Sequence, residues 1–172
     1  MRIYKILSAL LEYPDPELLA ALPEIKTLLR TDAQLVEPEC AALEKFLGRL
    51  EANDLTELQA AYVQTFDLTP EHSLHLTHHL FGDERGRGPA LIDLAEFYKS
   101  YGLHADEKEL PDYLPLLLEF AGTLDDTEAR VFLNQTVKVL QQLAANLEKA
   151  DSPYAPLIRI TEHHGQLARV AA

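Results

Sequence analysis

The sequence contains a single cysteine, Cys40, among 172 residues. One thiol cannot form a disulfide within the chain, and it cannot supply the several sulfur ligands of a Cys-rich zinc or iron–sulfur site. The lack of a disulfide framework is typical of proteins from a reducing compartment. We therefore expect a protein that folds without internal cross-links.

Positive charge is scarce as well. The chain has 15 Lys plus Arg against 28 Asp plus Glu, which gives a formal net charge of −13. Binding to nucleic acid needs a basic surface that displaces counterions from phosphates, so this composition argues against DNA and RNA as partners. An acidic surface would instead attract cationic peptides or proteins.

Long apolar runs are also missing. The most apolar stretch, from Leu114 to Leu118, is followed at once by Glu119, whereas a membrane span needs roughly 18 to 20 apolar residues. Lys5 and Glu12 interrupt the N-terminal segment, which therefore does not have the pattern of a secretory signal. We expect a soluble, cytoplasmic protein that does not insert into a membrane.

What the chain does have is enough apolar surface for a core. Hydrophobic residues make up 47% of the sequence and charged residues 25%, a composition typical of a folded globular protein. The length lies in the range of one domain, and two smaller pieces would each bury their surface poorly. We therefore expect residues 1–172 to form a single domain.

The apolar residues recur at helical spacing, which predicts an all-α bundle of roughly eight to ten helices. The first stripe comprises Ile3, Ile6, Leu7, Leu10 and Leu11. Capping residues, prolines and glycines place the expected helices at residues 2–13, 16–22, 23–30, 38–50, 55–67, 70–81, 89–102, 116–120 and 126–150, and in a last segment after Pro153 that carries Leu167 and Ala168.

Three histidines are candidate metal ligands. If residues 70–81 form one helix, His72, His75 and His79 fall at positions i, i+3 and i+7 of one face. Zinc needs a third or fourth ligand in a defined geometry, and the metalloprotease pattern with Glu directly after the first His is absent. A polar helix face is the simpler interpretation, although a metal-binding or hydrolytic protein stays open as an alternative.

The glycine-rich segment from Gly82 to Gly88 is expected to be a loop, with Pro89 opening the next helix. Arg85 and Arg87 beside a helix N-terminus are candidates for binding an anion such as a phosphate. No expected strand precedes the loop, as nucleotide-binding folds require, so a hinge is the simpler interpretation. A nucleotide-binding regulator remains an alternative.

Acidic residues gather around Glu109–Phe120, where two prolines predict a rigid turn before a short apolar helix. No nucleophile has an adjacent base, which argues against an enzyme. A groove floored by Tyr113, Leu117 and Phe120, with acids such as Asp112 and Glu119 on its rim, would suit a basic amphipathic peptide helix.

Several segments together resemble the NarJ-type chaperones of respiratory nitrate reductase, within the TorD-like redox-enzyme maturation proteins. The most specific is Glu109–Phe120, which is similar to the hallmark acid-Leu-Pro-Asp segment of the family. The other matching segments are Leu10–Asp15, Tyr62, Phe66-Asp67, Ser73-Leu74, His79, Gly82, Arg87-Gly88 and Asp93-Leu94. Two positions depart from the family pattern, because Tyr113 and Phe81 stand where histidine is common, and many relatives continue beyond the position of Ala172 with a charged tail.

The resemblance implies an all-helical, non-catalytic chaperone. Such proteins bind the N-terminal segment of the apo catalytic subunit in the cytoplasm, and they hold it until the molybdenum cofactor and an iron–sulfur cluster are inserted, before membrane attachment. It implies no permanently bound cofactor and either a monomer or a dimer. The positions carried over, with apolar neighbours at helical spacing, predict a peptide site formed by Tyr62, Phe66, Asp67, His79, Arg87, Asp112, Tyr113, Leu117, Glu119 and Phe120. A chaperone for another molybdoenzyme, such as a dimethyl sulfoxide or selenate reductase, is the main alternative.

Overall fold

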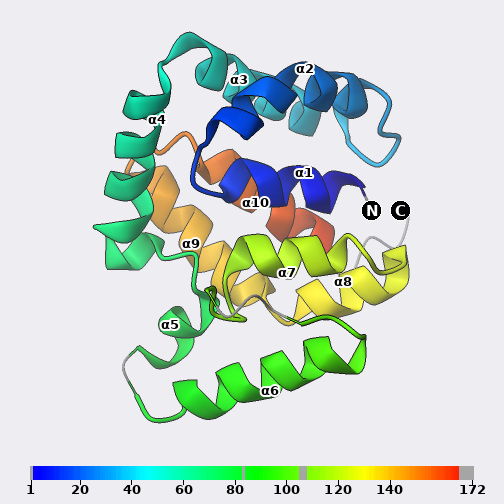
Figure 1. Ribbon diagram of the computed structural model, residues 1–172, viewed down its shortest axis with the longest axis vertical. Coiled ribbons are helices and arrows are strands. Elements are labelled where there is room, and N and C mark those ends of the chain that lie inside the picture. The colour runs from blue at the N-terminus through cyan, green and yellow to red at the C-terminus, as the bar shows by residue number, and fades with distance from the viewer. Residues whose placement is uncertain (1, 83, 105–107, 167–172) are drawn as a thin grey trace.

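The structure is a computed structural model that describes residues 2–82, 84–104 and 108–166. Ten α-helices occur in these ranges, and they confirm the predicted all-α bundle. Figure 1 shows how they are arranged. The helices are α1 (Arg2–Leu11), α2 (Pro16–Arg30), α3 (Glu37–Ala52), α4 (Leu55–Tyr62), α5 (Leu76–Phe81), α6 (Arg87–Ser100), α7 (Leu114–Ala121), α8 (Asp126–Asn134), α9 (Val137–Lys149) and α10 (Ala155–Gly165). A π-helical turn, Val63–Asp67, extends α4, and a 3₁₀ turn, Pro70–His72, precedes α5.

Helices α1 and α10 form the centre of the bundle. Helix α1 contacts α2, α7 and α10, and α10 also contacts α3, α8 and α9. Every member of the apolar stripe on α1 is buried, and burying such a stripe is the main source of stability for an amphipathic helix. The Ser8 hydroxyl donates to the carbonyl of Pro115 at 2.7 Å, which fixes α1 against α7.

Side-chain caps define several helix starts. The Asp15 carboxylate accepts from the backbone N–H of Leu18 at 2.7 Å, and the Asp54 carboxylate accepts from Glu57 at 2.9 Å. These are the caps expected from the sequence, since aspartate satisfies N–H groups that have no partner in the first helical turn.

One expected boundary, at Pro23, is wrong. Pro23 lies inside a continuous α2 instead of opening a second helix. A proline within a helix removes a hydrogen bond and typically costs about 3 kcal/mol. Here the buried residues Leu18, Leu22, Ile25 and Leu29 form one stripe that crosses the proline. Their shared burial against the core offsets the loss.

The expected helix over 70–81 is also wrong. Only the 3₁₀ turn and the six-residue α5 are helical there. Between them the chain is extended and pairs with residues 112–114. The N–H of Leu76 donates to the carbonyl of Asp112 at 3.1 Å, and the N–H of Leu114 donates to the carbonyl of Leu74 at 2.9 Å. This pairing forms an isolated antiparallel bridge between His75 and Tyr113.

The expected long helix over 126–150 is divided into α8 and α9. The N–H and the hydroxyl of Thr136 both donate to the carbonyl of Leu133, at 2.9 and 2.7 Å, and these bonds end α8. Gly165, in the last turn of α10, packs against the junction so closely that a Cβ there would lie 3.3 Å from Leu133 and from Val137. The break therefore lets two helices pack around the end of a third.

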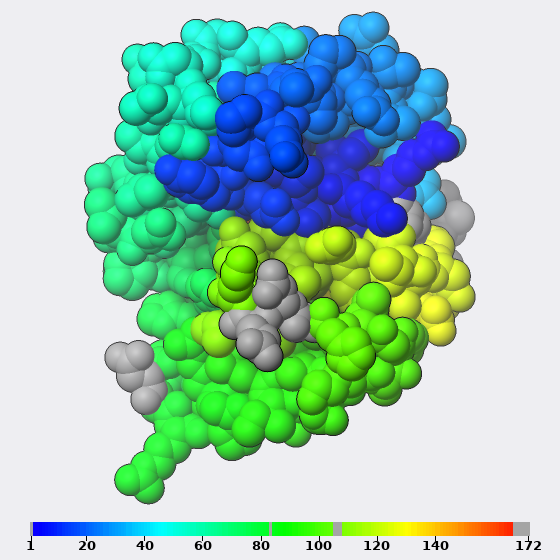
Figure 2. All heavy atoms as spheres, in the orientation of Figure 1, coloured from blue at the N-terminus to red at the C-terminus, as the bar shows by residue number. Residues whose placement is uncertain are grey.

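Helix α6 begins at Arg87, two residues before the expected start at Pro89, and the loop after it turns at Gly102, whose φ is 76°. The last helix, α10, begins at Ala155, and the Ser152 hydroxyl accepts from the N–H of Tyr154 at 3.3 Å just before it. The expected core residues Leu167 and Ala168 lie outside the described residues. Helices α5 and α6 form one end of the molecule, drawn in green in Figure 2.

Candidate peptide-binding site

The bridge between residues 74–76 and 112–114 is the central feature of the candidate site, and it uses the segment that the sequence singled out. Asp112 within it is 1% exposed. Its carboxylate accepts from the N–H of Thr77 at 2.9 Å, from the Thr77 hydroxyl at 2.5 Å and from Nδ1 of His75 at 3.3 Å. Asp112 thus caps the start of α5 from a distant part of the chain.

The electrostatics of Asp112 agree with this structural role. Burial opposes ionisation, but the hydrogen bonds from His75 and Thr77 outweigh it and hold the pKa of Asp112 below its ordinary value. Arg87 adds positive charge, since its Nη2 lies 3.9 Å from Asp112 Oδ2 and its Nε donates to the Thr77 hydroxyl at 3.0 Å. Asp112 and Arg87 therefore hold the segments around residues 77 and 112 together. Asp112 does not lie on the exposed acidic rim that the sequence predicted.

An apolar cavity of about 530 Å³ lies next to the bridge, between α5, α6, α7, α8 and α9. Most of its exposed lining surface is aliphatic and aromatic, which is typical of sites that accept apolar ligand groups, although Asp112, Glu128, Gln135 and three threonines also line it. The side chains that define it for the experiments below are Leu80, Leu94, Phe97, Leu117, Val131 and Phe132. Leu80 and Val131 are 63% and 50% exposed, so this cavity opens to solvent.

A second pocket, of about 270 Å³, flanks the other side of the bridge and is called here the tyrosine pocket. It is lined by Tyr13, Tyr62, Phe66, Asp67, Ser73, Leu74, His75, Glu109 and Tyr113. The Tyr62 hydroxyl bonds the Tyr113 hydroxyl at 2.9 Å and donates to the carbonyl of Leu11 at 2.8 Å. These bonds fix the floor of the pocket.

Two carboxylates, those of Asp67 and Glu109, line the tyrosine pocket. The pKa of Glu12 is raised, first by partial desolvation and then by repulsion from Glu119, Asp15 and Glu109. Like charges raise a carboxyl pKa only when they lie close together. Glu109 and the nearby Glu12, Asp15 and Glu119 therefore form a group of like charges beside this pocket, called here the acidic rim.

The structure brings only part of the predicted peptide site together. Tyr62, Phe66, Asp67 and Tyr113 share the tyrosine pocket. Leu117 lines the apolar cavity with buried Asp112, whereas Glu119 and Phe120 line a smaller recess of about 150 Å³. The predicted single groove floored by Tyr113, Leu117 and Phe120 is therefore wrong, because these side chains leave their segment in three directions.

The histidine cluster also separates. The helical spacing assumed for it does not exist, and each ring bonds a different partner. His72 bonds the carbonyls of Thr65 and Asn146, at 3.0 and 3.3 Å, His75 bonds Asp112, and His79 donates from Nε2 to the carbonyl of Ser73 at 2.7 Å. The three rings are held by the fold and are not directed at a common point, which removes them as metal candidates.

The predicted anion site is altered in the same way. Arg85 is exposed, whereas Arg87 is half-buried and bonded to Thr77. Arg87 therefore already binds Thr77 and lies near Asp112, so the structure does not leave both guanidinium groups free to bind one anion, which corrects the anion site expected from the sequence.

Sequence reasoning missed most of the apolar cavity. Leu80, Phe97 and Val131 come from three different helices, and no motif or spacing in the sequence singles them out. One signal was available, since large exposed apolar side chains often mark binding surfaces. Exposure is a tertiary property, however, and the sequence alone does not give it.

Residues 19–159 match the family described as the nitrate reductase delta subunit. The chain belongs to this family. Within it, the chain is 38% identical over 152 residues to the nitrate reductase molybdenum cofactor assembly chaperone NarJ of Escherichia coli K12, a match that covers 88% of this chain and 64% of the relative. It is 36% identical over 160 residues to the Bacillus subtilis 168 protein named "Probable nitrate reductase molybdenum cofactor assembly chaperone NarJ", covering 91% of this chain and 84% of the relative.

The fold is also found in a solved structure. A chain from Archaeoglobus fulgidus, described as a candidate redox enzyme maturation protein, superposes with a TM-score of 0.60 at 22% sequence identity. The match covers 95% of this delta-subunit family member and 92% of the other chain, and it supports the fold alone. Among the described residues, no helix has the length and apolar character needed to cross a membrane.

Proposed function

We propose that this protein is a non-catalytic assembly chaperone for the molybdenum-containing catalytic subunit of a nitrate reductase. Membership of the delta subunit family and the names of the Escherichia coli and Bacillus subtilis relatives support this proposal. The chain would act in the cytoplasm, hold the apo subunit until the molybdenum cofactor and an iron–sulfur cluster are inserted, and bind no cofactor permanently. Residues 1–172 would act as one domain, since α1 and α10, from opposite ends of the chain, pack together.

The segment held would be the N-terminal peptide of that subunit. The observation that carries this step is the open apolar cavity, whose lining would accept the apolar face of an amphipathic helix. The acidic rim of the tyrosine pocket would attract the basic face of the same peptide and raise its association rate. In this proposal the apolar cavity replaces the groove expected from the sequence. Asp67 and Glu119 would attract the basic face of the peptide, and Tyr113 would line the tyrosine pocket beside it.

Calorimetric titration with a peptide copying the first fifteen or so residues of the catalytic subunit, at low and moderate salt, tests this proposal. We expect one-to-one binding that weakens as salt rises. Val131→Asp places a charge in the apolar cavity and should weaken binding by about tenfold or more, which corresponds to about 1.4 kcal/mol. Ile92→Asp is the matched control, because Ile92 is 64% exposed on α6 and does not line the cavity.

The acidic rim is tested by Glu109→Lys and Glu119→Lys, both at exposed positions. Each should slow association and reduce the dependence on salt, with a smaller loss of affinity than Val131→Asp. Asp112→Lys is unsuitable as a rim variant, because Asp112 is buried and caps α5. Equal affinity in wild type, Val131→Asp and Glu109→Lys would contradict this placement of the peptide, and the absence of binding would contradict the choice of client segment. Sedimentation of the same samples distinguishes monomer from dimer.

A further inference from the structure

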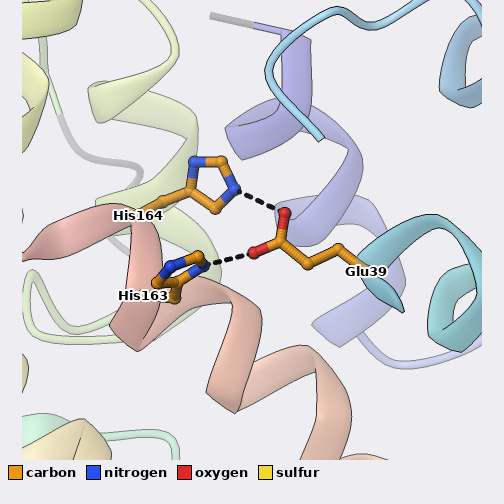
Figure 3. Close-up of side chains that lie close together, drawn as sticks. All are labelled: Glu39, His163 and His164. Atoms are coloured by element: carbon orange, nitrogen blue, oxygen red, sulfur yellow. Dashed lines mark hydrogen bonds and ion pairs between the residues drawn. The ribbon is translucent and has the colours of Figure 1, made fainter. Parts of the chain in front are cut away.

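A second cluster of titratable side chains lies outside the pockets of the candidate peptide site. Glu39, in the first turn of α3, faces His163 and His164 in the last turn of α10. Figure 3 shows both rings directed at the one carboxylate, with Nδ1 of His163 bonded to Oε1 and Nε2 of His164 to Oε2 at 3.3 Å. The two histidines lie more than 120 residues from Glu39 in the sequence.

The convergence of two adjacent histidine rings on one carboxylate is not what the packing of α3 on α10 alone would produce. Adjacent residues on a helix point about 100° apart, yet these two rings converge on the same carboxylate. His164 is 2% exposed and its Nδ1 has no hydrogen-bond partner. Its other ring nitrogen, Nε2, faces Glu39, so this buried ring is placed to meet the carboxylate and not to satisfy Nδ1.

From this geometry we propose that Glu39, His163 and His164 form a binding site for a divalent transition-metal ion, with Zn²⁺ the best match. Two imidazole nitrogens and one carboxylate oxygen are a donor set that zinc accepts, with a water molecule completing four-coordination. The three ligand atoms lie within 4.8 Å of one another. Ligands of a tetrahedral zinc ion are about 3.4 Å apart, so closing onto the ion needs a small side-chain adjustment.

His163 provides both that adjustment and the route for the ion. Its side chain is 30% exposed, whereas that of Glu39 is 8% exposed. Glu39 is held in place because its Oε2 accepts from the N–H of Val36 at 3.2 Å. The site therefore has two buried ligands and one partly exposed ligand at the solvent side. Its consequence would be a cross-link between α3 and α10, which stabilises the folded state by mass action when metal is present.

The test is titration of metal-stripped, tag-free protein with Zn²⁺ by calorimetry, and with Co²⁺ by visible absorption, which reports tetrahedral coordination. We expect one ion per chain and a rise in Tm with added Zn²⁺. His163→Gln should weaken binding by more than about tenfold, since even partners outside the ligand shell contribute about that much. This variant is preferred to Glu39→Gln, because Glu39 also supports the start of α3.

His78→Gln is the matched control, since it removes one imidazole from the histidine-rich segment around α5 and leaves the proposed ligands intact. Cys40→Ser tests whether the neighbouring thiol takes part. Stoichiometric binding that is retained in His78→Gln and Cys40→Ser and weakened in His163→Gln supports the site. The absence of saturable binding, or full affinity in His163→Gln, would show that the cluster is only a proton-mediated contact and would overturn the proposal. Neither result depends on the client peptide.

Discussion

Helices α1 and α6 differ sharply in how the fold uses them. Helix α1 buries seven of its ten residues, including an uninterrupted apolar stripe, whereas Tyr98 is the single buried residue among the fourteen of α6. Helix α1 contacts three other helices, and α6 packs mainly on the short α5. One helix is part of the core, and the other is attached at the end of the molecule that Figure 1 shows lowest.

The difference indicates where the molecule can adapt. Phe97 on α6 and Tyr101 directly after it line the apolar cavity but remain 38% and 47% exposed. Such side chains gain little from folding alone, and they have apolar surface left to bury when a partner docks. Regions with few buried contacts open at lower free energy than the core. The bundle around α1 would thus provide the rigid support, and α6 the adjustable wall of the cavity.

The largest expected contrast is between core and wall substitutions. Leu118, on α7 against α1, is fully buried, and Leu118→Ala should lower the free energy of unfolding by about 3 kcal/mol through lost burial and a cavity. Ile92→Ala, at an exposed position of α6, should change it by less than about 0.5 kcal/mol. Chemical denaturation followed by circular dichroism measures both. Similar losses would remove the distinction between the two regions.

The next largest effect concerns the hydrogen bonds of Asp112, which connect α5 to the segment before α7. Asp112→Ala removes the acceptor for the Thr77 N–H and hydroxyl and for His75. Leaving these donors buried should cost about 2 to 3 kcal/mol. The exposed Asp93→Ala on α6 is the control, expected to be nearly neutral. Peptide binding should fall together with stability in Asp112→Ala, and an unchanged denaturation midpoint would contradict the capping role.

A smaller and more local effect is expected at Tyr98. Its hydroxyl donates to the carbonyl of Pro111 at 2.8 Å, and its ring packs on Phe120 with centroids 5.0 Å apart. Tyr98→Phe removes only the hydrogen bond, worth about 1 kcal/mol. Because this tyrosine is the main anchor of α6, amide exchange should accelerate in α6 while α1 stays protected. Tyr101→Phe, at a 47% exposed position, is the control. Equal acceleration in α1 and α6 would show that α6 opens only when the whole bundle unfolds.

These regions also differ in how far the sequence could predict them. Local signals placed helix starts at Asp15 and Asp54, because an aspartate cap needs only its own next three residues. The continuous α2 through Pro23 and the break at Thr136 depend on what packs against each segment, which no local pattern reports. The extended segment around His75 has the same cause, since its partner is residue 113.

In the candidate site, too, the sequence predicted what is local and missed what depends on tertiary packing. The Glu109–Phe120 segment could be identified because its residues are contiguous in the sequence, and in the structure it supplies one side of the bridge between His75 and Tyr113. Its side chains, however, separate into different pockets, because the bridge and α7 direct Tyr113, Leu117 and Phe120 to different neighbours. The apolar cavity and the Glu39–His163–His164 cluster combine residues from distant helices. Individual residue types were visible in the sequence, but their convergence was not.

The smallest expected effect is a pH dependence that originates at the attached end of the molecule. Burial lowers the pKa of His79 from its ordinary value of 6.5, although its hydrogen bond to Ser73 opposes this. The unfolded chain therefore binds a proton at this site more readily than the folded chain. Stability linked to His79 is complete above pH 6.5 and is lost as the pH falls through the lowered folded pKa.

His79→Gln keeps a side-chain donor for the Ser73 carbonyl but cannot titrate, so its free energy of unfolding should decrease less than that of wild type between pH 7.5 and a pH below the folded pKa. Urea denaturation at a series of pH values measures the difference, with His78→Gln as the neighbouring control. Because α5 carries His79, we expect acid to loosen α5 and α6 before α1, which amide exchange at the same pH values would detect. If His79→Gln and wild type lose stability in parallel, the pH response arises elsewhere, and the attached end is no more sensitive to protons than the core.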